Sequence, residues 1–257
     1  MNVALFGGTF DPVHLGHLTV ARAAAQRFEL KRVYFVPAYV PPHKLRQPIT
    51  PFGHRYAMLA LATADEPHFL PSLLESPERR PEHGANYSID TLRHFKRALG
   101  RSDRVFFLIG IDAFLEIATW REPEALLQEA ELIVVSRPGF SLGDVGKALP
   151  SPLRPPEEVT KAMRQHPATG DIVLPGATIH LLEGVAESIS ATQIRQAAEK
   201  GRSLLKLVGA PVAEYIRKQG LYRSEPSQRR HRSSLAMSAG AGSGLKLLPG
   251  GKPRREK

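Results

Sequence analysis

The sequence predicts an α/β fold built on an open, doubly wound and mostly parallel β-sheet. Apolar runs typical of buried parallel strands, such as RVYFVPA at 32–38 and RVFFLIG at 104–110, alternate with segments whose apolar residues recur at helical spacing. This alternation is typical of parallel sheets whose crossovers are helices. Ligands of such sheets bind beyond the carboxyl ends of the strands, so the loops that follow the strands are the first candidates for a site.

The first elements form a βαβ unit. The strand NVALF at 2–6 is followed by a loop, a helix over 17–28 and the strand at 32–38. A helix over 53–64 and a strand near 68–75 come next. The segment SIDTLRHFKRALG is then expected to form a helix that Ser88 caps and Gly100 ends.

The second half of the chain continues this order. AELIVVSRPG at 130–139 contains another buried strand, and residues 140–177, rich in proline and glycine, are expected to form a surface excursion with one short helix. The strand TIHLLEG, the helix SATQIRQAAEKG and a closing helix in PVAEYIRKQGLY follow. Sequence periodicity ends at Tyr222, so we expect one domain over 1–222 and a disordered tail over 223–257.

Composition limits the classes of protein that fit. The net charge of +10 is concentrated in the tail, whose nine Lys or Arg residues against two acids give +7. We therefore expect at most a weak, salt-sensitive nucleic-acid contact by the tail. No apolar run is long enough to cross a membrane, the first residues lack a signal-peptide pattern, and the chain has no cysteine. These features favour a cytoplasmic protein, and a homo-oligomer is compatible with them.

The stretch GGTFDPVHLGH at 7–17 carries the strongest chemical signal. Gly7 and Gly8 allow a ligand to approach the backbone, and Thr9 offers a hydroxyl. The helix is expected to begin near residues 14–16, where its unpaired N–H groups and its dipole favour phosphate. His14 and His17, three residues apart, share one helix face. The stretch lacks the spelling of a P-loop, of a dinucleotide fingerprint and of a helical zinc pair, so no metal site is predicted.

A second anion site is predicted at SISATQIR, residues 188–195. Ser190 and Thr192 lie where a helix begins, and their hydroxyls can join the free N–H groups around an anion. Arg195 lies one turn further and can bind an oxyanion with its planar guanidinium.

GGTFDPVHLGH resembles the signature of the HxGH nucleotidyltransferase superfamily. The resemblance implies a Rossmann-like nucleotidyltransferase fold and the transfer of a nucleotide to a phosphorylated acceptor with release of pyrophosphate. It further implies that His14 and His17 contact the triphosphate of ATP and that the S-x-T-x-x-R element binds the β and γ phosphates. The catalytic residues are then expected to be His14, His17 and Arg195. The residues expected to bind ATP are Gly7, Gly8, Thr9, Phe10, His14, His17, Asp112, Ser190, Thr192 and Arg195.

Three further segments suit an acceptor. YVPPHK at 39–44 presents Lys44 on a stiff proline turn, NYSIDTL at 86–92 places Ser88 to Thr91 at a helix start, and GIDAFLEIATW brings Asp112 to a strand end with Trp120 eight residues on. Together they resemble the bacterial nicotinate-nucleotide adenylyltransferase family, in matching order from residue 1 to about 222.

The family resemblance assigns roles to these residues. It implies that Lys44 lies near the phosphate of nicotinate mononucleotide, the backbone around Thr91 near the nicotinate carboxylate, and Trp120 on the pyridine ring. Asp112 is then expected near a ribose hydroxyl or on the adenosine side. Magnesium is expected on the departing pyrophosphate, although the sequence shows no obvious carboxylate cage for it.

The acceptor phosphate is already anionic, so we expect in-line attack on the α-phosphate of ATP without a general base or a covalent intermediate. His17 would donate to the α-phosphate oxygens. Three alternatives remain at this point: another nucleotidyltransferase of the superfamily, such as one acting on phosphopantetheine; an RNA-associated protein, since HxGH also occurs in class I aminoacyl-tRNA synthetases; and a nucleotide sensor without turnover.

Overall fold

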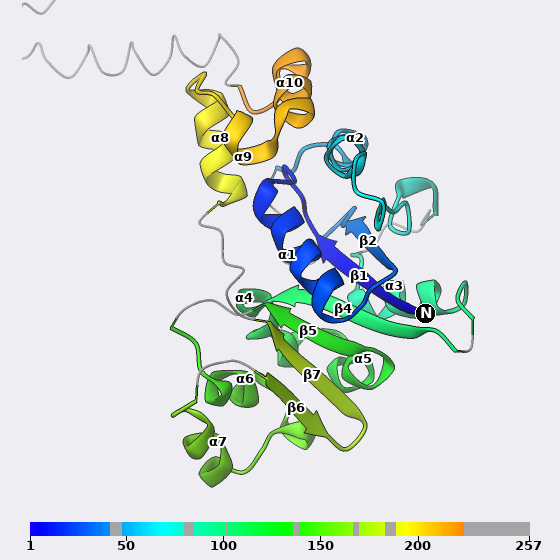
Figure 1. The fold of residues 1–257 in the computed structure, drawn as a ribbon, viewed down its shortest axis with the longest axis vertical. Helices are drawn as coiled ribbons and strands as arrows, with labels where there is room; N and C mark the ends of the chain where they lie inside the picture. Colours follow the sequence, from blue (N-terminus) through cyan, green and yellow to red (C-terminus); the bar gives the residue numbers. More distant parts are fainter. Residues whose placement is uncertain are drawn as a thin grey trace, which may run out of the picture. The chain divides into compact units, whose positions relative to one another are not determined.

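The computed structural model describes residues 1–41, 48–79, 85–100, 102–135, 139–166, 170–182 and 189–223. In this part of the chain one sheet of seven strands runs in the order β3-β2-β1-β4-β5-β7-β6 (Figure 1). The strands are β1 (Asn2–Gly8), β2 (Arg32–Pro37), β3 (Phe69–Pro71), β4 (Arg104–Gly110), β5 (Glu131–Val135), β6 (Gly170–Leu174) and β7 (Ala177–Leu182). Every pairing is parallel except that of β6 with β7, which confirms the predicted mostly parallel sheet.

Helices cover both faces of the sheet. They are α1 (Leu15–Arg27), α2 (Phe52–Thr63), α3 (Ser88–Lys96), α4 (Ile111–Phe114), α5 (Pro123–Glu129), α6 (Leu142–Ala148), α7 (Glu157–Met163), α8 (Ala191–Glu199), α9 (Leu205–Val208) and α10 (Ala210–Gln219). Residues Met1–Tyr222 form one compact unit.

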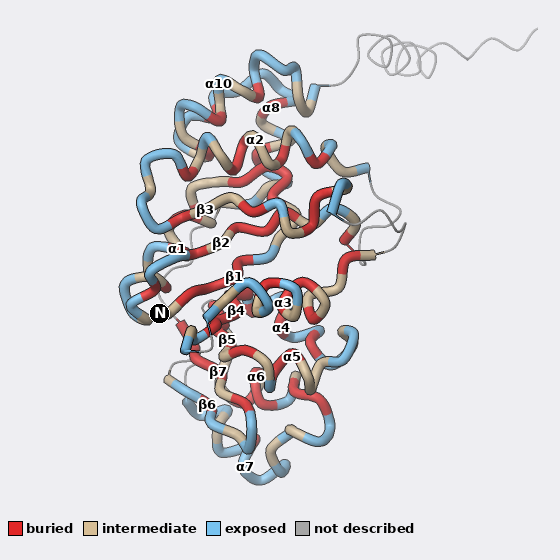
Figure 2. Tube along the Cα trace, turned by 90° about the vertical axis from the view of Figure 1, so that its right-hand side faces the viewer, coloured by how far each residue is buried: buried red, intermediate tan, exposed pale blue. Residues whose placement is uncertain are grey.

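Alternation along each strand divides the core into two clusters. Phe6 of β1 and Phe35 of β2 pack with α1, α2 and α8–α10 on one face. Leu5 and Phe107, which lie opposite each other on β1 and β4, pack with α3–α6 on the other. The buried trace therefore runs along the strands, with the exposed trace on the outer helices (Figure 2). Successive strand side chains point to opposite faces of the sheet, and helices cover both faces, as in a doubly wound fold.

Two of the local expectations were wrong at the helix that begins near Ser88. The residue at the cap position is Tyr87, in extended backbone, and Ser88 is the first helical residue of α3. The helix ends at Lys96, before Gly100, and residues 97–99 form a turn and a bend.

The region 140–177 is also more regular than expected. It contains two helices, α6 and α7, and the antiparallel edge strand β6 in place of one short helix. The two helices pack closely because Gly143 of α6 has no side chain: a Cβ there would lie 2.8 Å from the carbonyl oxygen of Thr160 on α7. The strands β6 and β7 are joined by Pro175 and Gly176, whose φ of 78° suits the second central position of a tight turn.

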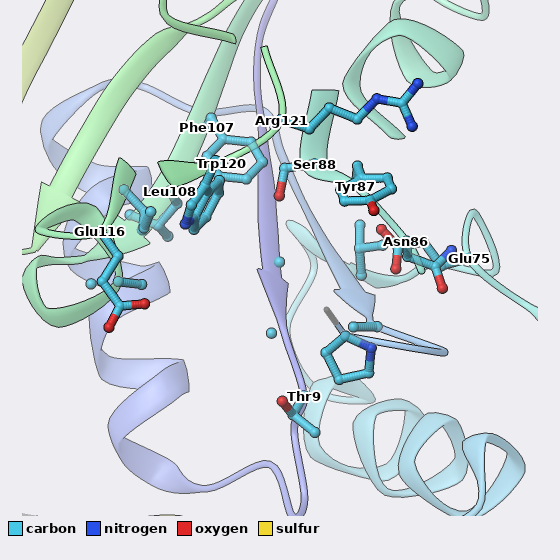
Figure 3. Close-up of a pocket in the computed structure, with 18 of the residues that line it drawn as sticks. Thr9, Glu75, Asn86, Tyr87, Ser88, Phe107, Leu108, Glu116, Trp120 and Arg121 are labelled. Atoms are coloured by element: carbon cyan, nitrogen blue, oxygen red, sulfur yellow. The ribbon is translucent and has the colours of Figure 1, made fainter. Parts of the chain in front are cut away.

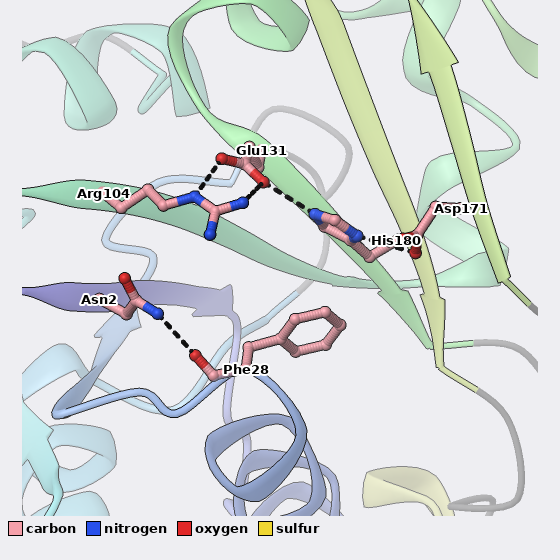
Figure 4. Close-up of polar contacts among 6 residues, drawn as sticks. All are labelled: Asn2, Phe28, Arg104, Glu131, Asp171 and His180. Carbon is pink, nitrogen blue, oxygen red and sulfur yellow. Dashed lines mark hydrogen bonds and ion pairs between the residues drawn. The ribbon is translucent and has the colours of Figure 1, made fainter.

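A chain of polar contacts joins β4, β5, β7 and β6 (Figure 4). Arg104 binds Glu131 through two hydrogen bonds of 2.6 and 2.7 Å. The buried His180 ring lies between Glu131 and Asp171, with each ring nitrogen 2.8 Å from a carboxylate oxygen. These bonds attach the edge strand β6 to the rest of the sheet.

Candidate active site

The loop after β1 lies where the strand order reverses, since β1 pairs with β2 on one side and β4 on the other. In open α/β sheets this point is the usual ligand crevice. Gly7 and Gly8, which end β1, and Thr9, which follows, all line a cavity of about 510 Å³ (Figure 3). A Cβ on Gly8 would lie 3.1 Å from the Phe10 ring, so a side chain there would press on that ring.

Phe10 does not present its side chain to a ligand. Its ring is 2% exposed and belongs to the core, and its backbone has a φ of 48°, in the left-handed region. The ring meets Phe6 edge-on at 5.6 Å and His17 at 4.9 Å between centroids. The Phe10 ring therefore packs against the His17 ring, and the predicted contact of this residue with ATP falls to its backbone.

His14 and His17 lie together at the start of α1. Their ring centroids are 3.7 Å apart, and the backbone N–H of His14 donates to Nδ1 of His17 at 3.2 Å. Since that Nδ1 accepts, a neutral His17 ring carries its proton on Nε2.

Both histidines are neutral donors at neutral pH. Burial lowers the pKa of His14 from 6.5 to about 4. Burial, with a smaller repulsion from His14, lowers the pKa of His17 well below 6.5. The histidine pair therefore offers N–H groups and no positive charge in the free protein.

The second predicted anion site is linked to the first. Ser190 caps α8, and its hydroxyl accepts from the Gln193 N–H at 3.2 Å. The guanidinium of Arg195 donates to the Thr192 hydroxyl at 3.2 Å and to the backbone carbonyl of Asp11 at 2.8 Å. The structure thus brings the start of α8 against the loop that precedes α1, as one triphosphate site requires.

The cavity beside this loop has an aromatic wall. Trp120 lines it and meets Phe107 of β4 edge-on, with centroids 6.5 Å apart. Tyr87 and Ser88, at the start of α3, line the cavity across from the tryptophan (Figure 3). Arg121 lies next to Trp120, with its guanidinium 4.9 Å from the centre of the Tyr87 ring.

The start of α3 has backbone N–H groups without a partner inside the helix. The first intrahelical bonds of α3 are donated by Asp90 and Thr91 to the Tyr87 carbonyl. The N–H groups of Ser88 and Ile89 therefore precede the helical bonds, and the positive end of the helix dipole lies there.

The other predicted acceptor residues are placed differently. Thr91 is buried and is not among the residues that line the cavity; its hydroxyl donates to Oε1 of Glu75 at 2.6 Å, and its N–H is used within α3. Asp112 is exposed on α4 and is not among the residues that line the cavity. Lys44 lies outside the described residues.

Sequence reasoning missed several residues of this region. Glu75, Asn86, Tyr87 and Arg121 line the cavity without having been predicted. For Tyr87 the signal was present, because it directly precedes Ser88 in the NYSIDTL segment. Glu75 had none, since it comes from a loop whose place in the fold depends on the short strand β3.

A metal cage of protein ligands does not occur in the described part of the chain. None of its groups of His, Asp or Glu residues has the arrangement to hold a metal ion with three ligands. The same described ranges contain no helix with the length and apolar character that crossing a bilayer needs.

Comparison with known proteins defines the class first. The family model of cytidylyltransferase-like proteins matches residues 5–197, which include the loop after β1, the residues that line the cavity and most of α8. The fold is similar to that of a structure described as Plasmodium falciparum nicotinic acid mononucleotide adenylyltransferase complexed with NaAD, with a TM-score of 0.61, 19% identity, and 86% of this chain and 97% of that chain covered. A fold and a site of this kind define a nucleotidyltransferase.

Sequence relatives then give the family. A protein of Moorella thermoacetica, named "Probable nicotinate-nucleotide adenylyltransferase", is 39% identical over 86% of this chain and 91% of its own length. One of Geobacter metallireducens with the same name is 39% identical over 86% of this chain and 98% of its own. The chain belongs to the nicotinate-nucleotide adenylyltransferase family, which confirms the resemblance seen in the sequence.

Proposed function

We propose that this protein transfers the adenylyl group of ATP to nicotinate mononucleotide, giving nicotinate adenine dinucleotide and pyrophosphate in NAD biosynthesis. The observation that carries the proposal is the joining of a histidine pair and Arg195 around the loop after β1, beside a cavity lined by Trp120. The family of the chain supports the same reaction.

The chemistry requires alignment and charge stabilisation. An oxygen of the acceptor phosphate forms a bond to the α-phosphorus of ATP while the bond from that phosphorus to the bridging oxygen of the β-phosphate breaks. Pyrophosphate leaves, and no proton has to be removed from the acceptor. The protein contributes by holding the reacting groups in line and stabilising the charge that builds on the α-phosphate.

Each predicted phosphate ligand has a role that suits its setting. His17 donates its Nε2 proton to an α-phosphate oxygen, because its Nδ1 already accepts from His14. Arg195 supplies the permanent positive charge for the β and γ phosphates, with the N–H groups at the start of α8. The backbone of Gly8 and Thr9 approaches the nucleotide from the end of β1.

The acceptor fills the cavity. Trp120 stacks on the pyridine ring, and the first N–H groups of α3, at Ser88 and Ile89, receive the nicotinate carboxylate. A helix N-terminus favours an anion over a neutral amide, which would select the acid form of the mononucleotide. Lys44 is proposed to bind the mononucleotide phosphate and Asp112 to lie on the adenosine side.

Magnesium is proposed to enter with ATP as its complex. Because the described residues do not form a carboxylate cage, the ion would be held by the phosphates of the substrate, and no step is assigned to a protein-bound metal. Weak nucleic-acid binding by residues 223–257 and a homo-oligomer stay predictions, since nearly all of the tail lies outside the described residues.

The test is an acceptor comparison with purified full-length protein and ATP. Nicotinate mononucleotide, nicotinamide mononucleotide and phosphopantetheine are supplied separately, and both pyrophosphate and the dinucleotide product are measured. Release of pyrophosphate with the nicotinate form and formation of nicotinate adenine dinucleotide are expected. Turnover with phosphopantetheine alone would assign the protein to the alternative acceptor, and ATP binding without turnover on any acceptor would make it a sensor.

A further inference from the structure

Tyr222 makes a long-range contact with the loop that follows β1, Thr9–Asp11, which we call the phosphate loop. Its hydroxyl donates to Oδ1 of Asp11 at 2.7 Å, between residues that are 211 positions apart in the sequence. Its backbone has a φ of 62°, in the left-handed region that a tyrosine rarely adopts. A conformation of this kind persists only where the surroundings hold it, and the bond to Asp11 is one such restraint.

Asp11 is a buried carboxylate with several functions in the loop. Its Oδ2 accepts from the Thr50 N–H at 3.2 Å, while its backbone carbonyl accepts from Arg195 at 2.8 Å. Only 7% of the residue is exposed, so a lost bond to its carboxylate would not be replaced freely by water. The position of Asp11 therefore determines where the Arg195 guanidinium is held.

Arg55 also holds the phosphate loop. The residue is 1% exposed, and its guanidinium donates to the carbonyls of Thr9 and Thr50, each at 2.8 Å. Burial lowers the pKa of Arg55, and the nearby Asp11 carboxylate opposes that shift. The loop Thr9–Asp11 is thus held at Thr9 by the buried Arg55 and at Asp11 by Tyr222.

We propose that Tyr222 is a positioning residue for the triphosphate site, acting through Asp11 on Arg195. The inference rests on the proposed function, because it assigns Arg195 to the phosphates of ATP. Neither Tyr222 nor the Asp11 carboxylate needs to touch the nucleotide: the hydroxyl orients the carboxylate, and the backbone of the same residue orients the guanidinium.

The chain offers a matched control at Tyr215. Its hydroxyl lies 2.8 Å from Nδ1 of His54, so it also ties the C-terminal segment to α2. Tyr215→Phe removes the same atom as Tyr222→Phe from a neighbouring tyrosine. The hydroxyl and the ring of Tyr215 contact His54 on α2, so Tyr215→Phe reports the cost of loosening α10 from α2.

The experiment compares the wild type with Tyr222→Phe and Tyr215→Phe. Binding of ATP is measured by calorimetry without acceptor, and KM is measured for ATP and for nicotinate mononucleotide. For Tyr222→Phe we expect the Kd and KM of ATP to rise about five- to twentyfold, with KM for the mononucleotide unchanged. Tyr215→Phe should lower the melting temperature without changing either KM.

Two results would overturn the proposal: an equal rise in the KM of ATP for both variants, or unchanged ATP binding in Tyr222→Phe. The calorimetric measurement separates this failure from failure of the proposed function, because it needs no acceptor. If Tyr222→Phe does not fold, Asp11→Asn is measured in its place and must weaken ATP binding. If Tyr222→Phe does fold, Asp11→Asn and the double variant Tyr222→Phe/Asp11→Asn complete a double-mutant cycle. Additive effects of the two substitutions on ATP binding would contradict coupling through Asp11.

Discussion

Replacing His14 by glutamine is expected to flatten the dependence of the free energy of unfolding on pH between about pH 7.5 and 5.5. Burial lowers the pKa of the folded His14 ring from 6.5 to about 4, whereas the ring in the unfolded chain keeps the ordinary value. Between these two values the unfolded state binds more protons than the folded state. Acidification therefore favours unfolding, and the contribution is present in full above about pH 6.5 and lost as the pH falls towards 4.

The magnitude follows from the two pKa values. At about pH 5.5 the protonated form of the unfolded ring outnumbers the neutral form about tenfold, while the folded ring is almost entirely neutral. The free energy of unfolding should then fall by about 1.3 kcal/mol between pH 7.5 and 5.5 because of His14 alone. His17, whose pKa is also lowered by burial, changes stability in the same direction.

Urea unfolding at constant ionic strength measures this difference. Trp120 is the only tryptophan of the chain and packs against Phe107, so its fluorescence reports on the folded core. The His14→Gln variant should lose about 1.3 kcal/mol less than the wild type over this pH interval, whatever its stability at pH 7.5. His94→Gln, which removes an exposed histidine of α3, is the control. A wild-type slope in His14→Gln would refute the claim that burial holds the ring neutral.

Two further substitutions test the proposed roles in the reaction. His17→Ala should lower turnover about 10²- to 10³-fold, because it removes a hydrogen-bond donor to the charge that builds on the α-phosphate; turnover within threefold of the wild type would exclude His17 from the chemistry. Trp120→Ala should raise KM for nicotinate mononucleotide about ten- to hundredfold by loss of ring stacking and leave KM for ATP unchanged. An equal rise in both KM values would show that Trp120 serves the fold and not the acceptor.

The sequence predicted the alternation of strands and helices because the continuous apolar runs and the helical spacing are both clear in this chain. The buried run RVFFLIG and the motif around His14 and His17 gave a strand and a helix start close to where the structure has them. Motifs that follow strands could be assigned to one edge of the sheet without knowing the strand order. This is why the loop after β1 and the start of α8 were expected to meet.

The failures have physical causes. The edge strand β6 is short, and its partner follows directly after Pro175 and Gly176, which were interpreted as part of an irregular excursion. Phe10 lies inside the motif with a left-handed backbone and a ring in the core, so only its backbone is left for the predicted contact with ATP, and the motif does not show this. Which residues of α3 line the cavity depends on how the helix is rotated, which the sequence does not give: Ser88 lines it, and Thr91 is buried.

Contacts between distant segments that lie outside these motifs could not be predicted. The bond from Tyr222 to Asp11 spans nearly the whole folded unit, and each residue alone has an ordinary alternative interpretation, a closing tyrosine and a turn aspartate. Arg55 appeared only as one residue of the helix predicted over 53–64, yet in the described part of the chain it is among the largest of the fully buried side chains. A buried arginine with two carbonyl partners is visible only when both carbonyls are placed in space.

In the proposed triphosphate site, two neutral histidines act as hydrogen-bond donors and one arginine supplies positive charge. A histidine that is buried and charged in the free protein would pay a desolvation cost that the described partners of His14 and His17 do not offset. Arg195 carries a permanent charge, and its guanidinium already donates to two oxygens. The permanent charge is therefore supplied from α8, and the start of α1 contributes neutral donors. This division requires the loop between them to be rigid, which is the requirement that Asp11, Arg55 and Tyr222 together meet.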